Sequence, residues 1–151
     1  HSAASAVSAV RPQIASADES GGLRWQPWDP EAIGQHRSAG RVVLVDFTAD
    51  WCLSCKVNER VALTGEEFTG RMLDANAVAM KADWTRPSEA IVHYLAGFGR
   101  YGIPFNAVYG PQATEGIALP ELLKSERKPA LSCAQAVQEE VQGLFVTLRM
   151  G

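Results

Sequence analysis

Apolar residues gather into short runs along the chain, and the period of each run predicts one element of secondary structure. The run over 41–48 is continuous rather than alternating, which is typical of a strand buried on both faces of a sheet. A looser alternation predicts a second strand over 77–84. A third strand is expected over 102–109, interrupted near its start by Pro104, with 116–119 as its hairpin partner.

Helices are predicted by capping residues and by apolar residues at helical spacing. Asp29 followed by Pro30 is typical of a helix start, and Gly40 is expected to close that helix. The predicted helices cover residues 30–38, 52–63, 66–73, 87–98 and 134–148. Because these helices alternate with the strands, the pattern predicts a mixed sheet covered by helices.

The N-terminal segment differs in composition from the rest of the chain. Residues 1–22 are rich in Ala and Ser and end in Gly21-Gly22, which is typical of a linker. We therefore expect a flexible linker or N-terminal extension over 1–23 and one domain over 24–151. The chain begins at His1 and no signal peptide is recognised, so a mature chain or a fragment of a longer one is expected.

Composition and charge narrow the classes of function. Hydrophobic residues make up 46% of the chain and charged residues 21%, as in proteins with an ordinary packed core. The formal net charge is −3 and no basic block is present, so neither nucleic acid nor an acidic lipid surface is an expected partner. No apolar run approaches the roughly 18–20 residues that span a bilayer, and no direct membrane insertion is expected.

The most informative motif is the Cys-x-x-Cys formed by Cys52 and Cys55, which follows the buried strand at the predicted start of a helix. Unpaired backbone N–H groups and the positive end of the helix dipole favour a thiolate at such a position. Because the thiolate is the form that attacks a disulfide, the motif predicts a thiol–disulfide oxidoreductase. Cys52 is then the exposed nucleophile, and Cys55, one turn later, resolves the mixed disulfide.

Two carboxylates are candidates for handling the protons of this reaction. Asp46 lies in the buried strand, and Glu59 lies one helical turn after Cys55. A carboxyl group in a low-dielectric site has a raised pKa and could take the proton of Cys55. Lys56 adds a positive charge nearby, and Trp51 is expected to shield the thiol and to contact partners.

The dipeptide Ile103-Pro104 is a candidate substrate-binding element. A Pro at the start of a strand cannot donate to the sheet ladder. A cis peptide here would expose the backbone of Ile103 for pairing with an extended substrate chain, and the sequence leaves cis and trans open.

Other interpretations of the cysteine motif remain open. A zinc site would need a second ligand pair, and the remaining Cys133, His36 and His93 are scattered, so no metal site is predicted. The alternatives are a Cu(I)-binding thiol module, a stand-alone thioredoxin and a permanent structural disulfide. Asp46 could instead pair with Lys56 in a purely structural role. Cys133 is expected to be a buried or incidental free thiol.

Several stretches of the chain resemble a known protein family. The stretch 45–56, with Gly102-Ile103-Pro104 downstream, resembles the thioredoxin fold. This implies an α/β fold with a central mixed β-sheet flanked by helices. The stretches 47–52, 55–59, 82–85 and 98–104 resemble the C-terminal (gamma) thioredoxin-like domain of the DsbD and ScsB family of thiol:disulfide interchange proteins. The resemblance covers about residues 24–125.

The resemblance implies a function and a location. Proteins of this family conduct reducing equivalents across the bacterial inner membrane, and their C-terminal domain lies in the periplasm. The domain takes electrons from a membrane-embedded dithiol of the same parent chain. It passes them to an N-terminal domain or to periplasmic thiol proteins, including those of cytochrome c biogenesis, without a bound cofactor.

The resemblance also implies a role for individual residues. Cys52 becomes the nucleophile, Cys55 the resolving thiol, Asp46 and Glu59 the acidic pair that tunes the thiols, and Pro104 a cis-proline. Two features depart from the family pattern, the segment 110–131 and Cys133.

Overall fold

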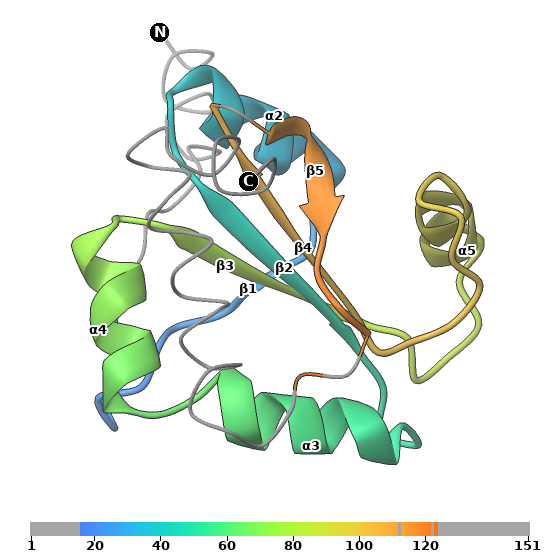
Figure 1. Ribbon diagram of the computed structural model, residues 1–151, viewed down its shortest axis with the longest axis horizontal. Coiled ribbons are helices and arrows are strands. Elements are labelled where there is room, and N and C mark those ends of the chain that lie inside the picture. The colour runs from blue at the N-terminus through green and yellow to red at the C-terminus, as the bar shows by residue number, and fades with distance from the viewer. Residues whose placement is uncertain (1–15, 112, 122, 124–151) are drawn as a thin grey trace, which may run out of the picture.

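A computed structural model describes residues 16–111, 113–121 and 123, and in it a five-stranded mixed sheet lies between helices (Figure 1). The strands are ordered β1-β3-β2-β4-β5; β1, β3 and β2 run parallel, and β4 and β5 are antiparallel to their neighbours. The elements in chain order are β1 (Gln26–Pro27), α2 (Pro30–Ser38), β2 (Val43–Thr48), α3 (Leu53–Ala62), α4 (Glu66–Asp74), β3 (Val78–Asp83), α5 (Glu89–Ala96), β4 (Phe105–Gly110) and β5 (Ala113–Ala118). The predicted mixed sheet covered by helices is confirmed.

The central strand β2 is buried along its whole length, as its continuous apolar character predicts. Side chains alternate between the two faces of a strand, so β2 contributes to two cores. Val43, Val45 and Phe47 pack with residues of α2 and α5. Leu44 packs on the other face with residues of α3 and α4. By the same alternation Asp46 shares the face of Leu44, which directs a carboxyl group toward α3.

Local signals place the helix starts correctly. Asp29 caps α2, where its side chain accepts a hydrogen bond of 3.0 Å from the N–H of Glu31. Ser88 caps α5 in the same way, with Ile91 as the donor at 3.3 Å. The third predicted strand is shorter at its start than expected. It begins at Phe105, because Pro104 has no N–H for the ladder.

Strand β1 is an element that the sequence analysis does not predict. Gln26 and Pro27 pair in parallel with Met80 and Lys81 of β3. A strand of two residues is too short to show a pattern of alternating hydrophobic and polar positions, and a Pro is compatible with a sheet edge. This edge strand is therefore defined only by its pairing with β3.

Part of the expected extension is also folded. Ala17 and Leu23 form an isolated bridge, and the Asp18 carboxylate accepts hydrogen bonds of 2.9 Å from the N–H groups of Ser20 and Gly22. Leu23 joins the core on the α3 and α4 face. The helix expected over 134–148 and the residue Cys133 lie outside the described residues. Within the described part of the chain, no helix is long and apolar enough to cross a membrane.

Candidate active site

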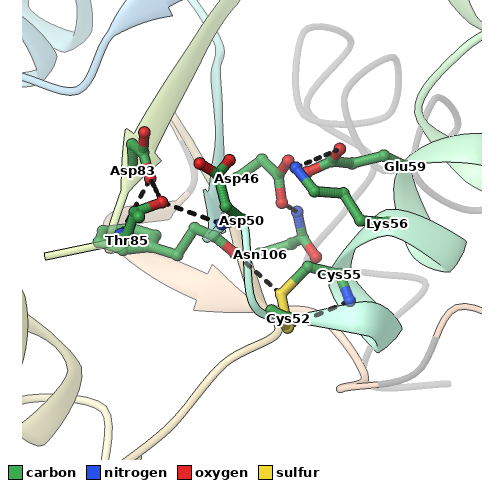
Figure 2. A network of polar contacts seen from close by, with 10 residues as sticks. Asp46, Asp50, Cys52, Cys55, Lys56, Glu59, Asp83, Thr85 and Asn106 are labelled. Carbon is green, nitrogen blue, oxygen red and sulfur yellow. Dashed lines mark hydrogen bonds and ion pairs between the residues drawn. A yellow bond between two sulfur atoms is a disulfide. The ribbon is translucent and has the colours of Figure 1, made fainter.

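Cys52 and Cys55 form a disulfide at the N-terminus of α3 (Figure 2). Cys52 is the N-cap, and its sulfur accepts a hydrogen bond of 3.2 Å from the backbone N–H of Cys55. One of the unpaired donors of the helix start is therefore aimed at the Cys52 sulfur. The position at a helix start that the motif predicts is confirmed.

Both cysteines are enclosed, although the sequence predicts an exposed Cys52. Cys52 exposes 5% of its surface and Cys55 1%, so the expectation of an exposed Cys52 is wrong for the disulfide form. The two residues form a small cluster with Ala49, against which Trp84 and Ile103 pack. Both cysteine side chains lie within this cluster, and Cys52 is the less enclosed of the two.

The side chains that flank Cys52 in sequence are solvent-exposed. Trp51 is 61% exposed and Leu53 79%. Both side chains lie directly beside the disulfide in the chain.

Asp46 is buried, with 1% of its surface exposed. Burial, followed by the nearby Glu59 carboxylate, raises its pKa to about 7. The positive charge of Lys81 and a hydrogen bond from Asn106 act in the opposite direction. Asp46 is therefore a carboxyl group that gains and loses a proton near neutral pH. The Cys55 sulfur lies 3.8 Å from the carbonyl oxygen of Phe47, the next residue along β2.

Glu59 approaches the same carboxyl group from α3. Its side chain is 17% exposed, and its Oε1 lies 4.0 Å from Nζ of Lys56. The structure thus brings together both predicted acidic residues and the predicted lysine. Lys56 pairs with Glu59, and no ion pair between Lys56 and Asp46 is present among the described residues.

Asn106 is a site residue that the sequence prediction misses. It lies in β4 directly opposite Asp46, and its Nδ2 donates a hydrogen bond of 2.8 Å to Oδ1 of Asp46. One sequence signal exists, since Asn is the polar residue within the apolar strand 105–109. That signal does not reveal which residue of another strand lies opposite.

A second group of residues that the sequence prediction misses stabilises the turn before Cys52. The hydroxyl of Thr85 accepts a hydrogen bond of 2.9 Å from the N–H of Asp50 and donates one of 2.5 Å to Asp83. The carbonyl oxygen of Thr85 accepts from the indole N–H of Trp51 at 3.3 Å. Figure 2 shows Asp83 and Thr85 on the side of Asp50 away from Glu59.

The peptide between Ile103 and Pro104 is cis. Ile103 packs against the cluster of Ala49 and the two cysteines, and Pro104 is buried. The substrate-binding candidates Ile103 and Pro104 are therefore beside the disulfide, at the entry of β4.

The two histidines considered as further metal ligands, His36 and His93, do not gather around the cysteines. His36 lies on α2, where burial lowers its pKa and its Nδ1 is 3.3 Å from Arg41. His93 lies on α5. In the portion of the chain that the structure describes, no three His, Cys, Asp or Glu side chains form a group that could hold a metal ion.

Comparison with known proteins agrees with this geometry. The model of a family described as thioredoxin-like matches residues 24–111. The thiol:disulfide interchange protein DsbD of Ralstonia nicotianae is 30% identical over 112 residues, which cover 70% of this chain and 18% of that protein. DsbD 1 of Pseudomonas aeruginosa is 36% identical over 84 residues, or 56% of this chain and 14% of that protein. The chain thus spans less than a fifth of the length of these relatives.

Solved structures give the same result for the fold. The oxidised C-terminal domain of Neisseria meningitidis DsbD superposes with a TM-score of 0.58 at 20% identity, covering 76% of this chain and 98% of that domain. Its reduced form gives a TM-score of 0.56 at 20% identity, with coverage of 74% and 92%. The α/β thioredoxin-like fold and the resemblance to DsbD are confirmed, and the chain belongs to the thioredoxin-like family.

Proposed function

We propose that this chain is a thiol–disulfide oxidoreductase domain that reduces protein disulfides through Cys52 and Cys55. The observation that carries the proposal is the disulfide at the start of α3, in which the Cys55 N–H points at the Cys52 sulfur. After reduction, the same N–H and the helix dipole favour a thiolate on Cys52. That thiolate is the nucleophile of thiol–disulfide exchange.

The reaction has two steps. The Cys52 thiolate attacks one sulfur of a partner disulfide, so that a mixed disulfide forms and the other partner sulfur leaves as a thiolate. Cys55 then loses its proton and attacks the Cys52 sulfur. The Cys52–Cys55 disulfide forms, the bond to the partner breaks, and the partner leaves as a dithiol. Two electrons have passed from the domain to the partner.

Asp46 is proposed to take the proton that Cys55 releases. A general base works best when its pKa is near the operating pH, and that of Asp46 is raised to about 7. The contact between the Cys55 sulfur and the carbonyl of Phe47 supports this role, because Phe47 follows Asp46 directly. Glu59 is proposed to act through Asp46, since its charge contributes to the raised pKa.

Trp51, Ile103 and Pro104 are proposed to contact the partner. The exposure of Trp51 beside the cysteine pair and the packing of Ile103 against it support this assignment. An extended segment of a partner protein would lie along the backbone of Ile103, with its disulfide held against Cys52.

The proposed setting is the bacterial periplasm, as part of an inner-membrane protein. The support is the likeness to proteins named DsbD, of which this chain matches only a short part. In this setting, a membrane-embedded dithiol of the same parent chain would reduce the Cys52–Cys55 disulfide. Periplasmic protein disulfides, including those of cytochrome c biogenesis, would then receive the electrons.

Reduction of insulin by dithiothreitol, followed by turbidity, tests the activity itself. We expect the chain to accelerate precipitation and the Cys52→Ser variant to have no effect. Equilibration of the Cys52–Cys55 couple with glutathione then tests the direction of electron flow. A potential at the reducing end of the thioredoxin range is expected, and one near that of a strong oxidant would reverse the proposed direction.

A further inference from the structure

Three side chains lie in register across the middle of the sheet, on three neighbouring strands. Asp46 of β2 is opposite Lys81 of β3 on one side and opposite Asn106 of β4 on the other. Asp46 and Asn106 are both buried, each with 1% of its surface exposed. A buried carboxylate needs donors or positive charge, and this row supplies one of each.

Among the described residues, the charged and polar groups around Asp46 come from three elements. From α3 come Glu59, whose negative charge favours the protonated acid, and its ion-pair partner Lys56. From β3 comes Lys81, whose positive charge favours the carboxylate and whose Nζ lies over the Trp25 ring at 4.6 Å. From β4 comes Asn106, the side chain hydrogen-bonded to Asp46.

The hydrogen bond from Asn106 orients the Asp46 carboxyl group and favours its ionised form. An amide N–H donates more strongly to a charged carboxylate oxygen than to a neutral acid, so it stabilises the carboxylate over the acid. It occupies Oδ1. Among the described residues no N–H group donates to Oδ2, and the Glu59 carboxyl is the other side chain that interacts with Asp46, where it favours the protonated acid. Figure 2 shows the Asn106 amide between the Asp46 carboxylate and Cys55, with its nitrogen toward Asp46. The second oxygen is therefore left to receive a proton.

We propose that Asn106 is a positioning residue for proton transfer: its amide holds Oδ1 of Asp46 and keeps this carboxyl group available as the acceptor of the Cys55 proton. This inference rests on the proposed role of Asp46 in resolving the mixed disulfide. In the step concerned, the Cys55 S–H bond breaks and its proton joins Asp46. The Cys55 thiolate then attacks the Cys52 sulfur, and the partner sulfur leaves with the electron pair of the broken bond.

The resolving step can be observed with 5,5′-dithiobis(2-nitrobenzoic acid) in a stopped-flow instrument. Reduced Cys52 attacks this reagent and releases one coloured thiolate, and Cys55 releases the second when it resolves the mixed disulfide. All variants carry Cys133→Ser, so that no third thiol reacts. The rate of the second phase, measured from pH 5 to pH 9, gives the midpoint at which the proton acceptor becomes ionised.

We expect Asn106→Leu to move this midpoint upward by about one pH unit, which slows the second phase about tenfold below the midpoint. The first phase, which needs only Cys52, should be unchanged. Asn106→Ala also removes the donor and adds no bulk, so it replaces Asn106→Leu if that variant does not fold. In an Asp46→Asn background, Asn106→Leu should cause no further shift, because its effect passes through Asp46.

Asn58 provides a matched control. It is also a buried asparagine, and its side-chain hydrogen bonds of 2.9 Å join the backbone of Glu121 and Leu123 rather than the acidic pair. Asn58→Leu should lower stability and leave the midpoint in place. An equal shift in Asn58→Leu, or no shift in either Asn106 variant, would overturn the role of Asn106. If Asp46→Asn itself leaves the pH profile unchanged, the proposed proton acceptor fails instead.

Discussion

The backbone N–H of Cys55 donates a hydrogen bond of 3.2 Å to the sulfur of Cys52. The two sulfurs of the disulfide are therefore not equivalent. Cys52 is held at the helix start by a donor that also stabilises a negative charge, whereas Cys55 lies within the first turn with 1% of its surface exposed. This asymmetry supports the proposed order, in which Cys52 attacks first and Cys55 second.

The first prediction concerns that order. In the Cys55→Ser variant, the Cys52 thiolate still attacks a partner disulfide, but nothing resolves the product. A covalent complex with insulin or another protein that contains a disulfide should therefore accumulate. Addition of dithiothreitol should then release the partner from this complex. Non-reducing electrophoresis and mass spectrometry detect it. Trapping through Cys55 in the Cys52→Ser variant, with none in Cys55→Ser, would reverse the assignment.

The second prediction concerns the stability of the disulfide form against pH. Burial raises the pKa of Asp46 from 3.8 in a free carboxyl group to about 7. Between these two values the folded state holds a proton that the unfolded state has lost, so the free energy of unfolding falls as pH rises through this window. Asp46→Asn removes this pH-dependent loss of stability. The variant should therefore be more stable than the unchanged chain above pH 7, by about 2 to 4 kcal/mol.

Urea unfolding from pH 4 to pH 8 measures this difference. Asp74→Asn, an exposed carboxylate at the end of α4, is the matched control and should give a curve parallel to that of the unchanged chain. If the Asp46→Asn curve also ran parallel throughout, Asp46 would have no raised pKa in the folded state.

The third prediction concerns Glu59. Its charge is the second cause of the raised pKa of Asp46, after burial. Glu59→Gln should lower the pKa of Asp46, and the pH at which stability stops falling should move down with it. The change is measured by the same unfolding series. Glu67→Gln, which removes a carboxylate paired with Arg71 at 3.7 Å on α4, should leave that pH unchanged.

The fourth prediction concerns the turn before Cys52. Thr85→Val removes the hydroxyl that accepts from the N–H of Asp50, while Thr85→Ser retains it. Hydrogen exchange of the Asp50 amide should be at least about fivefold faster in Thr85→Val and nearly unchanged in Thr85→Ser, because a lost hydrogen bond costs about 1 kcal/mol or more. Exchange at equal rates in both variants would show that Thr85 does not hold the turn.

Much of the fold follows from local patterns in the sequence. The continuous apolar run over 43–48 specifies a buried strand, and Asp29 and Ser88 cap helices through donors only a few residues away. The start of α3 at the Cys-x-x-Cys motif is equally local, so the chemistry of the cysteine pair can be inferred before any tertiary contact is known. The roles of Asp46 and Glu59 depend on family resemblance, because nothing local places a strand residue beside a helix residue.

Hydrophobic period and helix capping act within a few residues, so local sequence predicts most of the elements and places the Cys-x-x-Cys motif at a helix start. The neighbours of each strand and their register depend instead on contacts between distant residues. Asn106 meets Asp46 from 60 positions away, and Thr85 meets Asp50 from 35. Strand β1 likewise exists only through β3. Such contacts depend on long-range strand pairing, and a one-residue slip in register would turn Asn106 to the opposite face of the sheet.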